Sequence, residues 1–154
     1  MATYMMDEIG KPKDSVFRIY LCCSPEEQAL RMIDRDLRNT EDNEPDVTNE
    51  LRSAIRSFGR TKNKVADLAE IARELERVRR THEQPHAAFD HMITQFTRNA
   101  ERDSADRCRF QALYGTALDY RDPIYYDLVV DTSAIGEEEK LRRAMDAVER
   151  KFLE

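Results

Sequence analysis

The chain has 154 residues, with 25 lysines and arginines against 31 aspartates and glutamates, and its formal net charge is −6. Without a basic block to offset this acidic excess, a general nucleic-acid-binding protein is excluded. The length is that of one domain, so residues 1–154 are expected to form a single domain. Three cysteines without regular spacing and the absence of a long apolar run predict a cytoplasmic protein with no membrane contact.

The first predicted element is a strand at residues 16–23, a run rich in β-branched and aromatic residues. Ser24 and Pro25 follow, with Glu27 three residues after the serine, which is the pattern of a helix that begins with Ser24 as its N-cap. Apolar residues at helical spacing extend this helix to about Leu37. Residues 16–38 therefore read as a strand that leads directly into a helix.

The middle of the chain, residues 46–100, is predicted to be a helical insertion. Its first helix should end at Gly59, where the apolar pattern breaks. Two more helices, on either side of a turn at 82–85, should form an antiparallel hairpin with a buried seam. The apolar positions of the three helices are Val47, Leu51, Ile55 and Phe58, then Val65, Leu68, Ala72 and Leu75, then Phe89, Met92, Ile93 and Phe96. We interpret them as core rather than as a ligand site.

Residues 101–154 are predicted to contain a further helix, a second strand at 126–132 and a closing amphipathic helix. The apolar positions of the closing helix are Leu141, Ala144, Met145, Val148 and Phe152. The order of strand, helix, helical insertion, strand and helix predicts an α/β fold with two parallel strands. Parallel sheets are normally larger and covered on both faces, so the pattern indicates that further strands are missing.

Three arginines predict a cationic stripe if residues 98–109 form one continuous helix. At about 100° per residue, Arg98, Arg102 and Arg109 lie within about 40° of one another, whereas Arg107 lies on the opposite side. Such a stripe could bind phosphate groups, because phosphoryl transfer needs cations around the moving group. The alternative is a solvated helix surface on which neighbouring aspartates form local ion pairs with the arginines.

Two stretches of the chain resemble a known enzyme family. S-P-E-E-Q-A-L-R-M stands at 24–32, and Y-D-L-V-V-D-T-S stands at 126–133. Between them the motif R-D-x-A-D-x-x-R-F, followed by Y-G, is formed by Arg102, Asp103, Ala105, Asp106, Arg109, Phe110, Tyr114 and Gly115. The chain is similar here to the C-terminal half of the cytidylate kinases, most closely the archaeal type, which are P-loop nucleoside monophosphate kinases. The resemblance covers residues 16–38 and 100–152.

The resemblance implies a partial P-loop-kinase-like sheet with residues 46–100 as a long helical lid. It also implies that Arg102 and Arg109 are catalytic lid arginines that close over the phosphates, with Arg98 as a weaker candidate. The implied reaction is phosphorylation of CMP or dCMP by ATP, with Mg²⁺.

Three further residues receive roles from the same resemblance. Asp131 and Thr132 would contact the donor nucleotide. Arg31 would bind the acceptor phosphate, although Gln28 stands where the family has another arginine. Base selection stays open between CMP and other nucleoside monophosphates.

A glycine-rich phosphate-binding loop is missing from the sequence. The four glycines do not form G-x-x-x-x-G-K-[ST], and the one Gly-Lys pair, Gly10-Lys11, is followed by Pro12. We therefore expect the chain to be inactive by itself and to need an N-terminal half that carries the loop. The alternative is a non-catalytic interaction or regulatory module, which binds a partner or a second copy through an open strand edge and the helical hairpin.

The sequence contains no pattern typical of a metal site. His82, His86 and His91 lack a cysteine or carboxylate set at zinc-site spacing, so we expect solvent-exposed histidines and no metal site.

Overall fold

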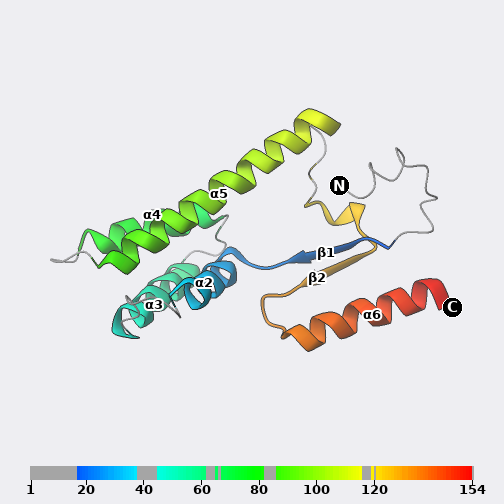
Figure 1. Ribbon diagram of the computed structural model, residues 1–154, viewed down its shortest axis with the longest axis horizontal. Helices are drawn as coiled ribbons and strands as arrows, with labels where there is room; N and C mark the ends of the chain where they lie inside the picture. The colour runs from blue at the N-terminus through cyan, green and yellow to red at the C-terminus, as the bar shows by residue number, and fades with distance from the viewer. Residues whose placement is uncertain are drawn as a thin grey trace. The chain divides into compact units, whose positions relative to one another are not determined.

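The computed structural model describes residues 17–37, 45–61, 65, 67–81, 86–115, 119 and 121–153. These residues form a mixed α/β structure that is mostly helical and contains a two-stranded parallel sheet (Figure 1). Where one domain is expected from the sequence, the chain separates into two compact units. The sheet unit comprises Met1–Cys23 and Ala105–Glu154, and the helical unit comprises Ser24–Ser104.

The sheet unit is built on two short strands, β1 (Ile19–Cys22) and β2 (Leu128–Asp131). They pair in parallel, with Ile19 opposite Leu128 and Cys22 opposite Asp131, which confirms the predicted strand pair. The predicted start of the first strand, Val16, lies outside the described residues. The second strand is shorter than predicted because the chain bends at Asp127, whose carboxylate binds Arg18.

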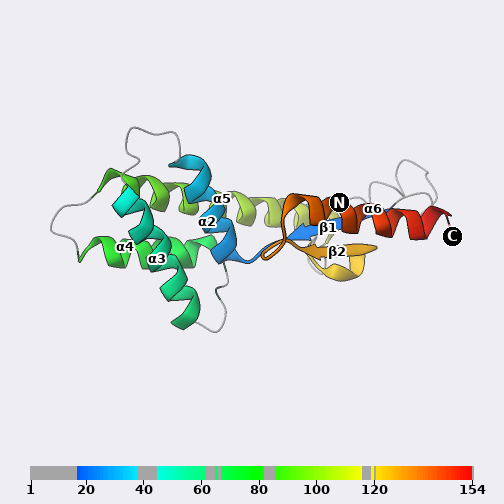
Figure 2. The same cartoon turned by 90° about the horizontal axis from the view of Figure 1, so that it is seen from below.

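Helix α6 (Glu137–Leu153) follows β2 and runs alongside the strands (Figures 1 and 2). A single 3₁₀ turn, η2 (Pro123–Tyr125), precedes β2 and is capped by Asp122. The buried apolar side chains of the described part of this unit are Phe110 and Val130. The described part of the sheet unit therefore has a very small core.

The helical unit consists of α2 (Pro25–Asp36), α3 (Pro45–Thr61), α4 (Leu68–Arg79) and the first part of α5 (Ala87–Tyr114). Ser24 is the N-cap of α2, as predicted, since its hydroxyl accepts a hydrogen bond from the Glu27 amide at 3.2 Å. Asp67 caps α4 in the same way, at 3.0 Å from the Glu70 amide. These caps satisfy amide groups that have no partner within the helix.

One core cluster joins the four helices of this unit. Seven of the eight seam residues predicted for the hairpin are buried in it, together with residues of α2 and α3, whereas Ile93 is partly buried and packs against it. The turn at 82–85 lies outside the described residues. The cluster consists of Ala29, Met32, Ile33, Leu37, Val47, Leu51, Ile55, Val65, Leu68, Ile71, Ala72, Leu75, Ala88, Phe89, Met92 and Phe96.

The predicted helix break at Gly59 is wrong, because α3 continues through this residue to Thr61. A Cβ atom at this position would lie 3.1 Å from Cγ of Glu26, so the glycine fits where α3 passes close to α2. Glycine lowers helix stability by only about 1 kcal/mol. The buried residues of α3, which all precede Gly59, stabilise the helix, and one glycine near its end does not outweigh them.

Helix α5 is one continuous element of 28 residues. It ends at Gly115, which has a φ of +97° and donates its amide to the Gln111 carbonyl at 2.8 Å. Glycine adopts this left-handed conformation without the steric cost that other residues incur, which explains the end of the helix at this position.

Candidate functional site

The arginines predicted to form a cationic stripe are exposed on α5, and two of them have carboxylate partners nearby. An Nη atom of Arg102 lies 3.8 Å from Asp103, and an Nη atom of Arg109 lies 3.0 Å from Asp106. The arginine side chains are 67% and 71% exposed. Arg98 is also exposed. Both pairs join neighbouring residues on an exposed helix surface, and such pairs contribute little to stability. Because the two side chains are exposed, their guanidinium groups remain accessible to other anions.

The boundary between the two units falls within α5, between Ser104 and Ala105. Arg98 and Arg102 thus belong to the helical unit, whereas Arg109 belongs to the sheet unit. Arg107, which the helical spacing set apart, is half-buried, and its Nε has no hydrogen-bond partner.

Asp131 and Thr132 lie at the carboxyl end of β2, where they organise the end of the sheet. The Asp131 carboxylate accepts a hydrogen bond from the Ser133 amide at 2.9 Å, and bonding to Ser133 lowers the pKa of Asp131. Thr132 is buried, and its hydroxyl donates to the Cys22 carbonyl at 3.0 Å. The Thr132 hydroxyl is thus engaged within the sheet, whereas Asp131 is exposed to solvent.

Arg31 belongs to the helical unit and lies on α2. Its Nε bonds the Glu27 carboxylate one turn earlier at 2.9 Å, and 39% of the arginine side chain is exposed. Arg31 and the turn after β2 are therefore parts of two different units.

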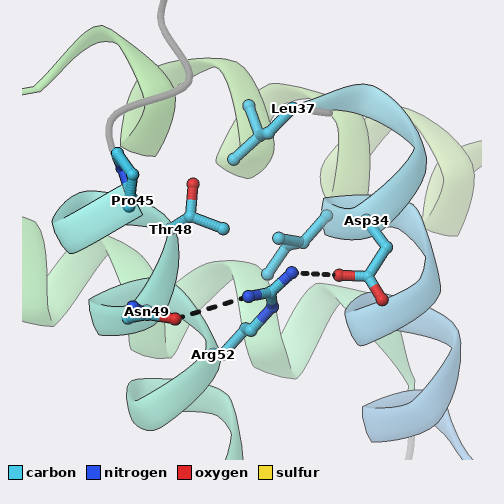
Figure 3. Close-up of a pocket in the computed structure, with 7 residues that line it drawn as sticks. Asp34, Leu37, Pro45, Thr48, Asn49 and Arg52 are labelled. Atoms are coloured by element: carbon cyan, nitrogen blue, oxygen red, sulfur yellow. Dashed lines mark hydrogen bonds and ion pairs between the residues drawn. The ribbon is translucent and has the colours of Figure 1, made fainter. Parts of the chain in front are cut away.

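The helical unit contains a hollow of about 170 Å³ between α2 and α3 (Figure 3). Arg52 forms an ion pair with Asp34 and a 3.4 Å hydrogen bond with the side-chain oxygen of Asn49. The hydroxyl of Thr48 is buried without a partner. The hollow is lined by Ile33, Asp34, Leu37, Pro45, Thr48, Asn49 and Arg52. Ligand pockets for molecules of nucleotide size are roughly 300–1,000 Å³, so this hollow is too small for a nucleotide.

An exposed apolar surface lies on the sheet unit and is formed by α6 and β1. Its α6 part is a stripe at steps of four, three and four residues, whereas Ala144 and Ala147 of the same helix are half-buried. We define the α6–β1 apolar surface by its members and their exposed fractions: Ile19 36%, Leu21 57%, Leu141 62%, Met145 53%, Val148 37% and Phe152 46%. The stripe that the sequence predicts to close a core therefore faces solvent.

Asp127 holds the three parts of the sheet unit together. Its carboxylate accepts hydrogen bonds from the amide of Arg18 at 2.8 Å and from the Arg18 Nε at 3.0 Å. Nζ of Lys151, near the end of α6, donates to the same carboxylate at 3.1 Å. The rings of Phe17 and Phe152 meet edge to face beside it, with centroids 6.5 Å apart. The start of β1, the start of β2 and the end of α6 are thereby joined.

Sequence reasoning missed Asp127 and Arg18. The two residues are 109 positions apart, and no local pattern relates them. Both lie inside the predicted strands at 16–23 and 126–132, and each stands immediately before the strand that the structure forms, β1 or β2.

Among the described residues, no group of three or more histidine, cysteine or acidic side chains could hold a metal ion. His82 lies outside these residues and His91 is exposed, whereas His86 is half-buried rather than solvent-exposed as predicted. Burial, reinforced by the charge of Asp131, raises the pKa of the Cys22 thiol, which disfavours its reactive thiolate form. None of the described helices combines the length and the apolar character needed to cross a bilayer.

In comparisons with known proteins, no protein-family model, no curated protein and no solved structure matches the chain.

Proposed function

We propose that the chain is an interaction module whose two-stranded sheet is completed by a second polypeptide. The observation that carries this proposal is the α6–β1 apolar surface, with six large apolar side chains at least about one-third exposed. Scattered single apolar residues are ordinary on a protein surface, but a row along one helix beside a strand is typical of an interface.

The size of the sheet supports the proposal. In the described sheet unit, β1 pairs with β2 alone, and each strand has four residues. Three or more strands with a covered face are normally needed for a stable sheet. With Phe110 and Val130 as its buried apolar side chains, the described sheet unit buries far less apolar area than the helical unit. A covering partner would bury the additional area that the sheet lacks.

Amide hydrogen exchange tests the proposal. In dilute solution we expect the amides of β1, β2 and α6 to exchange rapidly, while those of α2, α3 and α4 are protected by their own core. Protection of the sheet unit should increase when the apolar surface is covered. Equal protection of both units in a dilute monomer would contradict the proposal, because the sheet unit would then be complete by itself.

A second candidate function is that of a cytidylate-kinase-like half. The specific observation in its favour is the parallel strand pair, with Asp131 at the carboxyl end of β2, where open α/β sheets bind ligands. The exposed Arg102 and Arg109 would supply positive charge to phosphate groups. The reaction would be the transfer of a phosphoryl group from ATP to CMP or dCMP, once an N-terminal half supplies a glycine-rich loop.

The chain alone does not fit Mg·ATP. Its sequence has no phosphate cradle, the Thr132 hydroxyl is engaged by Cys22, and the Asp131 carboxylate is held by Ser133. We therefore assign no catalytic step to the chain alone. The arginines would act only on nucleotides that the completing half holds in place.

Thermal unfolding with and without nucleotides tests this candidate. We expect saturating CMP with Mg·ATP to leave the Tm of the chain unchanged, because a ligand raises Tm only when it binds the folded state. A rise of several degrees that Arg102→Ala abolishes would contradict this expectation and would make the chain a nucleotide-binding protein by itself. Arg77→Ala, on the exposed surface of α4, is the matched control, since the Arg77 side chain is 78% exposed.

A further inference from the structure

We propose that the polypeptide covering the α6–β1 apolar surface is a second copy of this chain. The two copies would be related by a two-fold axis, with β1 beside β1 and α6 beside α6, both antiparallel. This inference rests on the proposed interaction function, since it names the partner for the same surface. Three features of the sheet unit carry it: an open strand edge, the spacing of an apolar stripe, and the charges beside that stripe.

The first feature is the free edge of β1. Within the described residues, β1 pairs with β2 on one side and leaves the backbone groups of its other side open. Such an edge is a template for pairing with another strand. A two-fold axis perpendicular to the sheet would bring two β1 edges together as an antiparallel pair, because a two-fold contact uses the same patch on both copies. The result would be a continuous four-stranded sheet.

The apolar side chains of β1 lie on the face of the sheet along which α6 runs. Side chains alternate along a strand, so Ile19 and Leu21 share a face with Phe17, and the Phe17 ring meets Phe152 of α6. Val130 lies opposite Leu21 in the sheet and is buried, whereas Leu21 is 57% exposed. The uncovered part of this face is therefore the part nearest the open edge. A second copy at that edge would cover it.

The second feature is the symmetry of the stripe on α6. Its residues follow one another at steps of four, three and four positions, a spacing that reads the same in both directions. Two antiparallel copies of the helix therefore place Leu141 opposite Phe152 of the partner subunit. The same superposition places Met145 opposite Val148 of the partner subunit. Alternating steps of three and four are the spacing of helices that pack side by side.

The third feature is the charge on the solvent side of this stripe. Arg142 and Glu149 follow Leu141 and Val148 and occupy equivalent flanking positions. In the antiparallel arrangement, equivalent flanking positions face each other, so Arg142 lies near Glu149 of the partner subunit, and the pair occurs twice. Arg142 is 63% exposed while it bonds Glu139 and Asp146 of its own helix, so its guanidinium remains accessible to a further carboxylate. The opposite flank carries Ala144, whose small side chain permits close approach.

Self-complementary spacing and self-complementary charge favour a second copy over an unrelated partner. An unrelated partner would place no symmetry requirement on α6. The dimer would bury the exposed apolar residues of both chains and would pair the strand edges at the same time. Both effects act at one axis, between Asp146 and Ala147 of the two helices.

Analytical ultracentrifugation of the full chain at 1–100 µM tests the proposal, with a dimer of twice 18.1 kDa as the expected species. Met145→Glu should raise the dimer Kd on the order of 100-fold, because it places a charge at the centre of an apolar contact. Leu113→Glu is the matched control, since Leu113 is 68% exposed but lies on α5, outside the surface. Dimerisation that survives Met145→Glu unchanged would overturn the proposal.

Exchanging the charges of Arg142 and Glu149 distinguishes a specific interface from nonspecific apolar association. Arg142→Glu and Glu149→Arg should each raise the Kd roughly 3- to 10-fold, and the double variant should recover most of the loss. Independent, additive losses would contradict the antiparallel arrangement. A chain that is monomeric at 100 µM overturns the second-copy proposal in either case. If its sheet amides then exchange rapidly, the proposed function stands with another partner; if they are protected, the proposed function fails too.

Discussion

Replacing Phe96 by alanine is expected to lower the free energy of unfolding of the helical unit by about 3–4 kcal/mol. Phe96 is fully buried on α5 and belongs to the core cluster shared by α2, α3 and α4. Removal of its ring deletes apolar contacts and leaves a cavity that rigid helices fill only in part. Urea denaturation followed by far-UV circular dichroism measures the change, because the helical unit contributes much of the helix signal.

Leu113→Ala is the control for this variant. It removes a large apolar side chain from the same helix, but Leu113 is 68% exposed, so we expect a change within about 0.5 kcal/mol. The six tyrosines all belong to the sheet unit, and the chain has no tryptophan. Tyrosine fluorescence should therefore report that Phe96→Ala leaves the sheet unit unchanged. A loss below 1 kcal/mol would show that the four helices do not share one core.

The helical unit could be predicted well because its signals are local. Ser24 with Glu27 marks the start of α2, and the spacing of apolar residues predicted most of the buried core, although Ile71 and Ala88 were missed and Phe58 and Ile93 are only partly buried. Gly59 misled the prediction because a glycine can end a helix or allow two helices to approach. Only the position of Glu26 on the neighbouring helix distinguishes these alternatives.

The sheet unit was less predictable because its contacts are distant in sequence. The apolar stripe of α6 was evident from the sequence, but periodicity does not say what covers a stripe, and here the stripe is exposed. The local ion pairs of Arg102 and Arg109 agree with the alternative interpretation of a solvated helix surface, since their partners are one and three residues away. A role for these arginines in nucleotide chemistry stays a prediction, as do those of Arg98, Arg31 and Asp131.

The Asp127→Asn substitution is expected to destabilise the sheet unit by about 2 kcal/mol at pH 7. The carboxylate binds both Arg18 and Lys151, its side chain is only 20% exposed, and asparagine cannot neutralise the two cations. Tyrosine fluorescence during urea unfolding measures the loss. Asp106→Asn is the matched control, because Asp106 pairs with one exposed arginine and should contribute less than about 0.5 kcal/mol. Equal effects of the two variants would show that Asp127 does not join the strands to α6.

The same carboxylate predicts how the sheet unit responds to acid. Hydrogen bonds from Arg18, reinforced by Lys151, hold the pKa of Asp127 well below its ordinary value. The pKa of an aspartate in the unfolded chain is about 3.9. The folded state therefore gains stability from Asp127 above that pH and loses it as the pH falls further. Asp119 also contributes to the acid response, since the Arg121 side chain lowers the pKa of Asp119. The difference in stability between the wild-type chain and Asp127→Asn isolates the contribution of Asp127. That difference should be constant from pH 7 to about 5 and should shrink from pH 4 to 2; a constant difference down to pH 2 would show that Asp127 stabilises the unit through its shape rather than through its charge.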